Sequence, residues 1–322
     1  MKLHFDKSWA RQFDPNSDEP ELIVGEKSNM DSVLALQGKN DLLANWKKFP
    51  LEEIIDRKWV GEKITDFIKD GERVLELFLD KVYANIPLVY PLSCAHWRRT
   101  TTEKVKKGRN EFSLLAWHLY VLHKADLIEC KNIFNREYIT DAFLKQLSAQ
   151  SIHKDGPLRV KEILHDIGIT LIIEPCLSQS HVDGASMLSR SMNPVIGMSL
   201  RYDRIDNFWF TLFHELIHVQ RHLNVDNHIF IDDFDKGNIV DDLECVADRL
   251  AGEALIPRNI FRRSNAYRLK INKKAIRELA DKLQIHPAIV AGRIRNDIDR
   301  YDILSDMIGQ GEVCKLFEEF QN

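Results

Sequence analysis

The strongest constraint on the fold is the stretch Phe208–His222, in which two histidines lie four residues apart inside a strongly apolar segment. His214 and His218 are i and i+4, so on a helix their imidazoles stand one above the other on a single face. The large hydrophobic side chains around them recur at three- and four-residue spacing and predict a buried helix: Phe210, Leu212, Phe213, Leu216, Ile217 and Val219.

The segment His214-Glu215-Leu216-Ile217-His218 is an H-E-x-x-H arrangement, which supplies two zinc ligands and a carboxylate that acts as general base. With 12 histidines in 322 residues, chance would produce this pattern in roughly a few per cent of such chains. Burying two histidines and a glutamate in an apolar helix is costly unless a partner satisfies them, and a metal ion does so. A buried helix with chance histidines is therefore the weaker interpretation.

A catalytic zinc needs a third protein ligand and keeps its fourth position for water. His222 continues the histidine row, but it lies two turns from His214, a rise of about 12 Å, which is too far to share one ion. We expect His222 to be exposed or to lie behind the ligands.

Residues 240–257 form a second predicted helix, with small and apolar residues at helical spacing and a proline at its end. Glu244 and Asp248 are i and i+4 on it. Acidic pairs usually mark a solvated face, but Ala247 and Ala251 beside this pair indicate close packing on another helix. We expect Glu244 to complete the metal site and Asp248 to accept a ring N–H from a ligand histidine.

The remaining periodicity predicts an α+β fold that is mostly helical and has a small three-stranded sheet. Residues 50–150 and the chain after residue 257 show helical spacing almost throughout. Three short segments immediately before the metal helix have the composition of strands: 169–174, 185–188 and 195–200.

Several groups of residues in this part of the chain resemble the ImmA/IrrE family of metallopeptidases, and more narrowly the peptidase-like part of HigA-type regulators. The principal ones are the metal helix from Phe208 to His218, the motif Glu244-x-x-Ala247-Asp248 and Leu255-Ile256-Pro257. Asp183-Gly184-Ala185-Ser186 and 198–202 resemble the strands that precede the active helix, and 285–293 resembles the C-terminal signature. The resemblance is specific from about Leu158 to Asn296.

The resemblance implies a gluzincin-like zinc peptidase of the zincin type, with His214, His218 and Glu244 as ligands and Glu215 as general base. It implies a protein substrate, namely a transcriptional repressor or a toxin–antitoxin component, because relatives of known function cleave helix-turn-helix repressors. The sheet edge beside the metal would receive the substrate as an added strand. Members of the fused group begin with a helix-turn-helix, whereas residues 1–48 contain no recognisable one.

These patterns divide the chain into three expected regions. They are an N-terminal arm or linker (1–48), a helical domain (49–155) and an ImmA/IrrE-like zinc metallopeptidase domain with C-terminal helices (156–322).

The expected chemistry is hydrolysis of a peptide bond. Zinc would lower the pKa of its bound water and polarise the scissile carbonyl. Glu215 would take the proton of that water and pass it to the leaving nitrogen. Arg201 and Tyr202, just ahead of the metal helix, are candidates for an oxyanion or substrate contact.

Two other interpretations stay open. The metal site could be structural or latent in an antitoxin-like regulatory protein that acts by holding a partner. Residues 275–295 imitate a helix-turn-helix in which Arg293 and Arg295 could meet phosphate, although a helix pair covering the peptidase core fits the same residues. The basic stretch 98–109 could also touch nucleic acid, but such runs are more often solvated surface.

Composition limits the possible partners and the cellular compartment of the protein. A net charge of −4 gives no overall basic field for nucleic acid. Five scattered cysteines without a C-x-x-C pair indicate reduced thiols. No apolar stretch approaches 18 residues, and the N-terminus lacks a signal-peptide core. We therefore expect a cytoplasmic protein that does not contact membranes.

Overall fold

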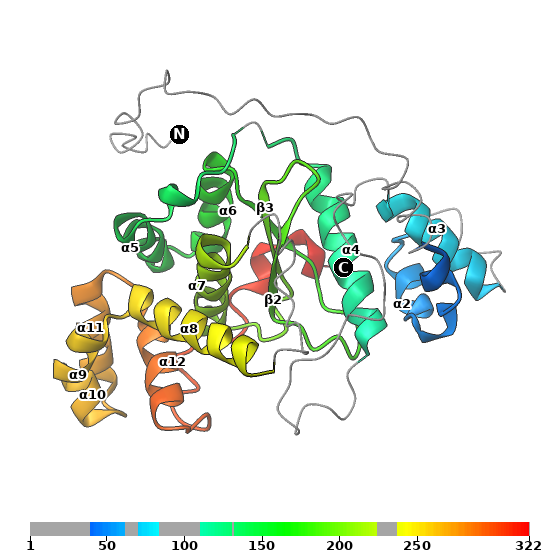
Figure 1. The fold of residues 1–322 in the computed structure, drawn as a ribbon. Helices are drawn as coiled ribbons and strands as arrows, with labels where there is room; N and C mark the ends of the chain where they lie inside the picture. Colours follow the sequence, from blue (N-terminus) through cyan, green and yellow to red (C-terminus); the bar gives the residue numbers. More distant parts are fainter. Residues whose placement is uncertain (1–38, 62–69, 84–109, 131, 224–236, 322) are drawn as a thin grey trace, which may run out of the picture.

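The computed structural model describes residues 39–61, 70–83, 110–130, 132–223 and 237–321, and backbone only for 237–242. In this part of the chain a small sheet lies at the centre with helices on both of its faces (Figure 1). Most of the predicted N-terminal arm and all of the basic stretch 98–109 lie outside the described residues.

The sheet has three strands in the order β1-β3-β2. They are β1 (Thr170–Ile173), β2 (Gly184–Leu188) and β3 (Pro194–Met198). β3 pairs in parallel with β1 and in antiparallel with β2, so β2 is an edge strand among the described residues. The α+β prediction and its three-stranded sheet are confirmed, and the strand boundaries differ from the expected ones by at most two residues.

Side chains on β2 alternate between the two faces of the sheet, as strand geometry requires. Ala185 and Met187 belong to the hydrophobic cluster formed with α4 (Glu111–Asp126), whereas Leu188 belongs to the cluster formed with α7 (Ile205–Arg221). Ser186 faces α7 as well, where it contacts that helix directly. The sheet is thus the middle layer between α4 and α7.

Three short elements pack on the outer side of α4: η2 (Trp46–Lys48), α2 (Leu51–Asp56) and α3 (Gly71–Tyr83). The ring of Trp59, which follows α2, stacks on Tyr120 of α4 with centroids 4.0 Å apart. This group extends the α4 cluster away from the sheet (Figure 1).

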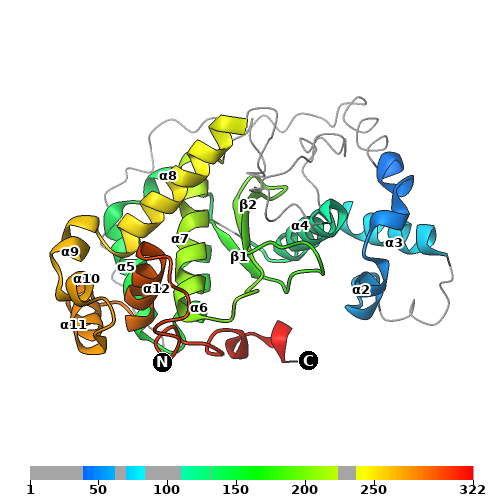
Figure 2. The same cartoon turned by 90° about the horizontal axis from the view of Figure 1, so that it is seen from below.

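The other face of the sheet carries the larger group of helices. Figure 2 shows α8 crossing α7 and α12 lying beside it. The members are α5 (Asp141–Ala149), α6 (Gly156–Asp166), α8 (Gly237–Leu255), α9 (Arg258–Arg263), α10 (Asn265–Leu269), α11 (Lys273–Leu283) and α12 (Pro287–Asp297). Helix α5 lies within the segment 49–155 that we expect to be a helical domain, yet it packs on α8 and belongs to the same hydrophobic cluster as the metal helix.

The start of α7 is fixed by the C-terminal segment of the chain. Its N-cap residue, Arg204, makes no side-chain capping hydrogen bond. Instead the backbone N–H of Ile205 donates to the carbonyl of Ile308 over 3.0 Å. Asp203 Oδ1 accepts from the backbone N–H groups of Val313 and Cys314, each over 2.9 Å. Residues more than 100 positions away therefore determine where the metal helix begins.

Within the described part of the chain, no helix is both long enough and apolar enough to span a bilayer.

Candidate metal centre

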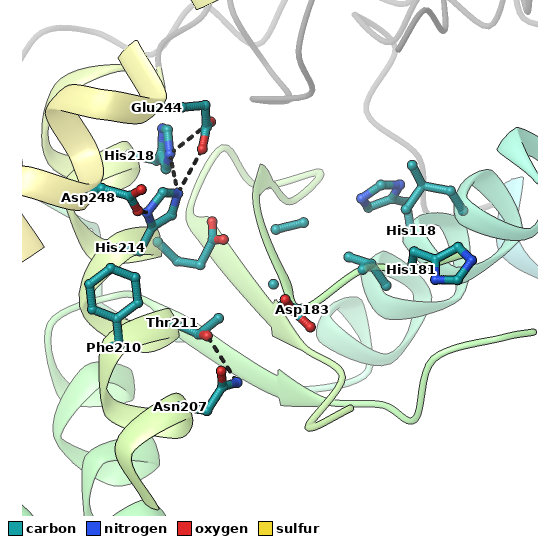
Figure 3. Close-up of a pocket in the computed structure, with 15 residues that line it drawn as sticks. His118, His181, Asp183, Asn207, Phe210, Thr211, His214, His218, Glu244 and Asp248 are labelled. Atoms are coloured by element: carbon teal, nitrogen blue, oxygen red, sulfur yellow. Dashed lines mark hydrogen bonds and ion pairs between the residues drawn. The ribbon is translucent and has the colours of Figure 1, made fainter. Parts of the chain in front are cut away.

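Three side chains from two helices converge on one point (Figure 3). The Nε2 atoms of His214 and His218 on α7 are 2.9 Å apart. Glu244 on α8 places Oε2 at 3.1 Å from Nε2 of His214 and Oε1 at 3.3 Å from Nε2 of His218. A tetrahedral zinc with bonds of about 2.0–2.1 Å separates its ligand atoms by about 3.3 Å, so these distances fit zinc within a few tenths of an ångström.

The same three residues form the one group of His, Cys, Asp and Glu in the described part of the chain whose atoms are close enough to hold a metal. The third ligand expected from the sequence, Glu244, thus lies beside the histidine pair, although 26 residues separate it from His218. The donor set of two imidazoles and one carboxylate is the type used by catalytic zinc sites.

The histidines and Glu244 shift one another's pKa values in opposite directions. Burial alone would lower the pKa of His214, but hydrogen bonds with Asp248 and Glu244 outweigh it and raise this pKa to about 10. Burial would raise the pKa of Glu244, but hydrogen bonds with His214 and His218 lower it to about 2. Without an ion, a protonated imidazole therefore balances the carboxylates. A divalent cation would take over that role and release the proton.

The Nδ1 atom of each of these two histidines also has a hydrogen-bond partner. Nδ1 of His214 lies 2.8 Å from Oδ1 of Asp248, and Nδ1 of His218 lies 2.9 Å from Nδ1 of His222. Burial, followed by the charge of His218, lowers the pKa of His222 to about 4, so its ring is neutral and can accept a hydrogen bond. With Nε2 of both inner histidines turned to the shared point, their Nδ1–H groups donate outward, an assignment made from this geometry.

Strand β2 positions Glu215. This side chain is only 7% exposed, and its Oε2 atom accepts a hydrogen bond of 2.6 Å from Ser186 Oγ. Ser186 itself is fully buried. Two residues earlier on the same face of the strand, a Cβ added at Gly184 would lie 2.8 Å from Glu215 Oε1. One carboxylate oxygen is therefore held by a hydroxyl, while the absence of a side chain at Gly184 leaves room beside the other.

Sequence reasoning missed the role of Ser186 and Gly184. It included both in a strand of the resembling family and assigned neither a contact. The available signal was the alternation of the strand, which places residues 184 and 186 on one face. That signal becomes informative only once β2 is known to lie against α7.

A groove of about 360 Å³ surrounds the candidate ligands and Glu215. Its walls come from α7, from the end of α8 that carries Glu244, from Leu114 and His118 of α4, and from the edge strand β2 with the residues just before it. Residues 182–185 line it, so the edge of β2, which is unpaired among the described residues, borders the metal group.

The two residues proposed for an oxyanion or substrate contact do not line this groove. Arg201 forms a two-pronged ion pair with Asp183, with Nε–Oδ1 and Nη2–Oδ2 distances of 2.9 and 3.3 Å. Its guanidinium lies over the ring of Tyr202, 4.6 Å from the centroid, and Tyr202 is 45% exposed. Arg201 thus reaches the groove through Asp183 and through His181, whose Nδ1 lies 3.4 Å from Nη1 of Arg201, and the arrangement gives no support to a direct contact with the reacting groups.

The helix-turn-helix-like segment packs against the metal helix. Six residues of α12 are buried, and Arg295 is only 4% exposed, so its guanidinium is not available to a phosphate. The arrangement corresponds to the helix pair that covers the core, the second of the two interpretations given for residues 275–295.

Residues 165–295 match the family model of the IrrE N-terminal-like domain, Peptidase_M78. The matched segment spans all three strands, α7, α8 and most of α12, and so contains the complete candidate metal centre. The comparisons with curated proteins and with solved structures gave no match. Between residues 165 and 295 the chain therefore carries a peptidase-like domain of the ImmA/IrrE family.

Proposed function

We propose that this protein is a zinc-dependent endopeptidase that cleaves a protein partner. The observation that carries the proposal is the convergence of His214, His218 and Glu244 to within 2.9–3.3 Å of one another beside the buried carboxylate of Glu215. The family of the domain supports a metallopeptidase-like hydrolase.

In the proposed site, the two imidazole Nε2 atoms and the Glu244 carboxylate hold the metal. A zinc ion bound there would supply an activated water and a Lewis acid for the scissile carbonyl. Asp248 and His222 keep the ligand rings in the orientation that turns Nε2 inward. A zinc site with these ligands would be of the gluzincin type, as the resemblance implies.

Glu215 acts as the general base. Ser186 holds its Oε2 atom, which leaves Oε1 to accept the proton of the attacking water and to deliver it to the leaving nitrogen. The carboxylate keeps its position during both transfers because the hydroxyl that holds it is fully buried on a strand.

The substrate binds as an extended segment along the free edge of β2. Backbone N–H and C=O groups of an edge strand pair with any extended chain, which gives affinity with little demand on sequence. A segment bound in this way passes the candidate metal centre, because residues 182–185 and the metal group line the same groove. By the resemblance to HigA-type regulators, the candidate substrates are a helix-turn-helix repressor or a toxin–antitoxin component.

The test is cleavage of an unfolded protein, and of any repressor encoded next to this chain, by the zinc-loaded full chain. Glu215→Gln should bind zinc like the wild type and lose about 10²–10⁴-fold in turnover. Glu278→Gln, which changes an exposed glutamate on α11, is the matched control and should retain activity. Full activity of Glu215→Gln with normal zinc content would remove Glu215 as the base.

An antitoxin-like binding protein with a structural or latent metal is the alternative. The observation in its favour is that Asp248 and His222 hold both ligand histidines in place, which a structural metal site needs as much as a catalytic one. Stoichiometric zinc with tight binding of a partner and no turnover would favour this alternative.

A further inference from the structure

A second cavity, which we call the Arg293 pocket, adjoins the catalytic groove. It has a volume of about 180 Å³ and lies between the N-terminal half of α7, the C-terminal half of α8, and α12. Asn207 and Phe210 line both cavities, so the two are neighbours. Figure 3 shows these two residues on α7 ahead of His214, on the same stretch of helix that borders the metal group.

The polar wall of this pocket carries an excess of positive charge. Arg204 is neutralised by Asp206, with Nε–Oδ1 and Nη2–Oδ2 distances of 3.0 and 3.4 Å. Arg293 has no carboxylate at ion-pair distance within the part of the chain that the structure describes, and its contact is the ring of Phe261, 5.8 Å away. The guanidinium of Arg293 is partly buried, and a buried charge is costly until an opposite charge joins it.

A glycine inside α8 makes room for this guanidinium. A Cβ added at Gly252 would lie 2.1 Å from Nη1 of Arg293, which is far inside contact distance. Glycine within a helix is normally destabilising, so its presence here has a local reason. The missing side chain lets Arg293 lie directly on α8 and present its charge to the pocket.

The size and lining of the pocket indicate its occupant. Its volume is below the range of about 300–1,000 Å³ that small-molecule sites occupy, and it suits a single side chain. Leu255, Ile256 and Ile289 form an apolar wall, and Arg293 supplies the charge. A short aliphatic stem that ends in a carboxylate matches both features, and guanidinium is the group that binds carboxylates best.

We propose that the Arg293 pocket binds an acidic side chain, glutamate or aspartate, of the substrate segment close to the scissile bond. The proposal rests on the endopeptidase function given above. It assigns a sequence preference to an enzyme whose strand-edge binding alone would be nearly indifferent to sequence.

The test uses a peptide library prepared from a whole proteome, digested by the zinc-loaded full chain, with cleavage sites mapped by mass spectrometry. The wild type should show at least about fivefold enrichment of Glu and Asp at one position near the cleaved bond, a magnitude in keeping with a single charged contact. Arg293→Met should lose this enrichment, and Arg293→Glu should shift it towards Lys and Arg. Arg262→Met, which changes an exposed arginine on α9 outside the pocket, should leave it unchanged.

Gly252→Ala gives a second variant that keeps the charge. The added methyl should displace the guanidinium and weaken the preference for acidic residues, while zinc content and the thermal unfolding midpoint stay near those of the wild type. These two measurements also show whether each Arg293 variant is folded.

The possible outcomes distinguish a failure of the Arg293 pocket proposal from a failure of the proposed function. Cleavage at internal bonds without an acidic preference, or a preference that survives in folded Arg293→Met, would overturn the pocket and leave the endopeptidase intact. A zinc-loaded wild type that cleaves no peptide in the library would overturn the endopeptidase, and the pocket with it.

Discussion

Helices α4 and α7 lie on opposite faces of the same sheet, and each buries eleven of its residues. Each also carries two histidines, of which His118, His123 and His218 are buried and His214 is partly buried. On α4, His118 and His123 are five residues apart, which points them about 140° apart around the helix axis. On α7, His214 and His218 are four apart, which separates them by about 40°. A histidine pair on a packed helix thus becomes a candidate ligand pair through its spacing, not through its burial.

The direction in which the histidine pKa is shifted also differs between the two helices. Burial, and then the charge of Lys81, lowers the pKa of His123, which keeps that ring neutral in the core. For His214 the carboxylates of Asp248 and Glu244 overcome burial and raise the pKa to about 10. The pKa values of the two histidines therefore shift in opposite directions, because carboxylates from α8 form hydrogen bonds with His214, whereas the charge facing His123 is that of a lysine.

The largest expected difference between α4 and α7 is in zinc content, when one histidine is removed from each helix. His218→Ala should reduce the zinc content after dialysis from about one ion per chain to near zero, with loss of cleavage, because a catalytic zinc needs three protein ligands. His123→Ala should keep its zinc. Metal analysis of both purified variants is the measurement, and stoichiometric zinc in His218→Ala would refute the site.

Removal of the Asp248 carboxylate, the hydrogen-bond partner of His214, tests whether such a partner affects zinc affinity. Asp248→Asn should weaken zinc binding by about 10–100-fold, since it exchanges a charged acceptor for a neutral amide. Titration against a zinc-binding dye measures this, and Asp281→Asn on α11 is the exposed control. Equal affinities for both variants would show that Asp248 does not support the ligand.

A smaller effect should follow from Ser186→Ala. Loss of the hydrogen bond to the Glu215 carboxylate should lower kcat by about tenfold and change KM little, because a hydrogen bond to a charged group contributes at least about 1.5 kcal/mol. Ser199→Ala removes another buried hydroxyl, which donates to the carbonyl of Val182 and lies away from Glu215. If both variants lose kcat equally, the cause is damage to the sheet.

The stability of the metal-free protein should also depend on pH. The pKa of His214 is about 10 in the fold against an ordinary value of 6.5, so its stabilisation is complete below pH 6.5 and is lost as the pH rises towards 10. The thermal unfolding midpoint should therefore fall across this window in the wild type, and less so in His214→Asn. Circular dichroism measures both, and identical profiles would contradict the charge assignment.

Zinc affinity should depend on pH in the opposite direction from the stability of the metal-free protein. Binding releases the proton of His214, so zinc affinity should rise with pH, by up to about tenfold per unit while that proton is displaced. The zinc titration of the wild type at several pH values checks this expectation.

The sequence alone predicted the main elements of this protein and the residues of its candidate metal centre. The apolar periodicity and four-residue spacing of α7, and the acidic pair on α8, are local patterns, and local patterns specify which side chains share a face. They were sufficient to predict the α+β fold and to name His214, His218 and Glu244, which the structure brings together.

Tertiary structure decided what lies opposite those faces. Ser186 meets Glu215 across 29 residues, and Arg293 meets Gly252 across 41. The crossing of α7 by α8 and the register of β2 set these contacts, and no spacing within one segment encodes either. For the same physical reason Arg201 and Tyr202, which are close to the metal helix in sequence, lie outside the groove.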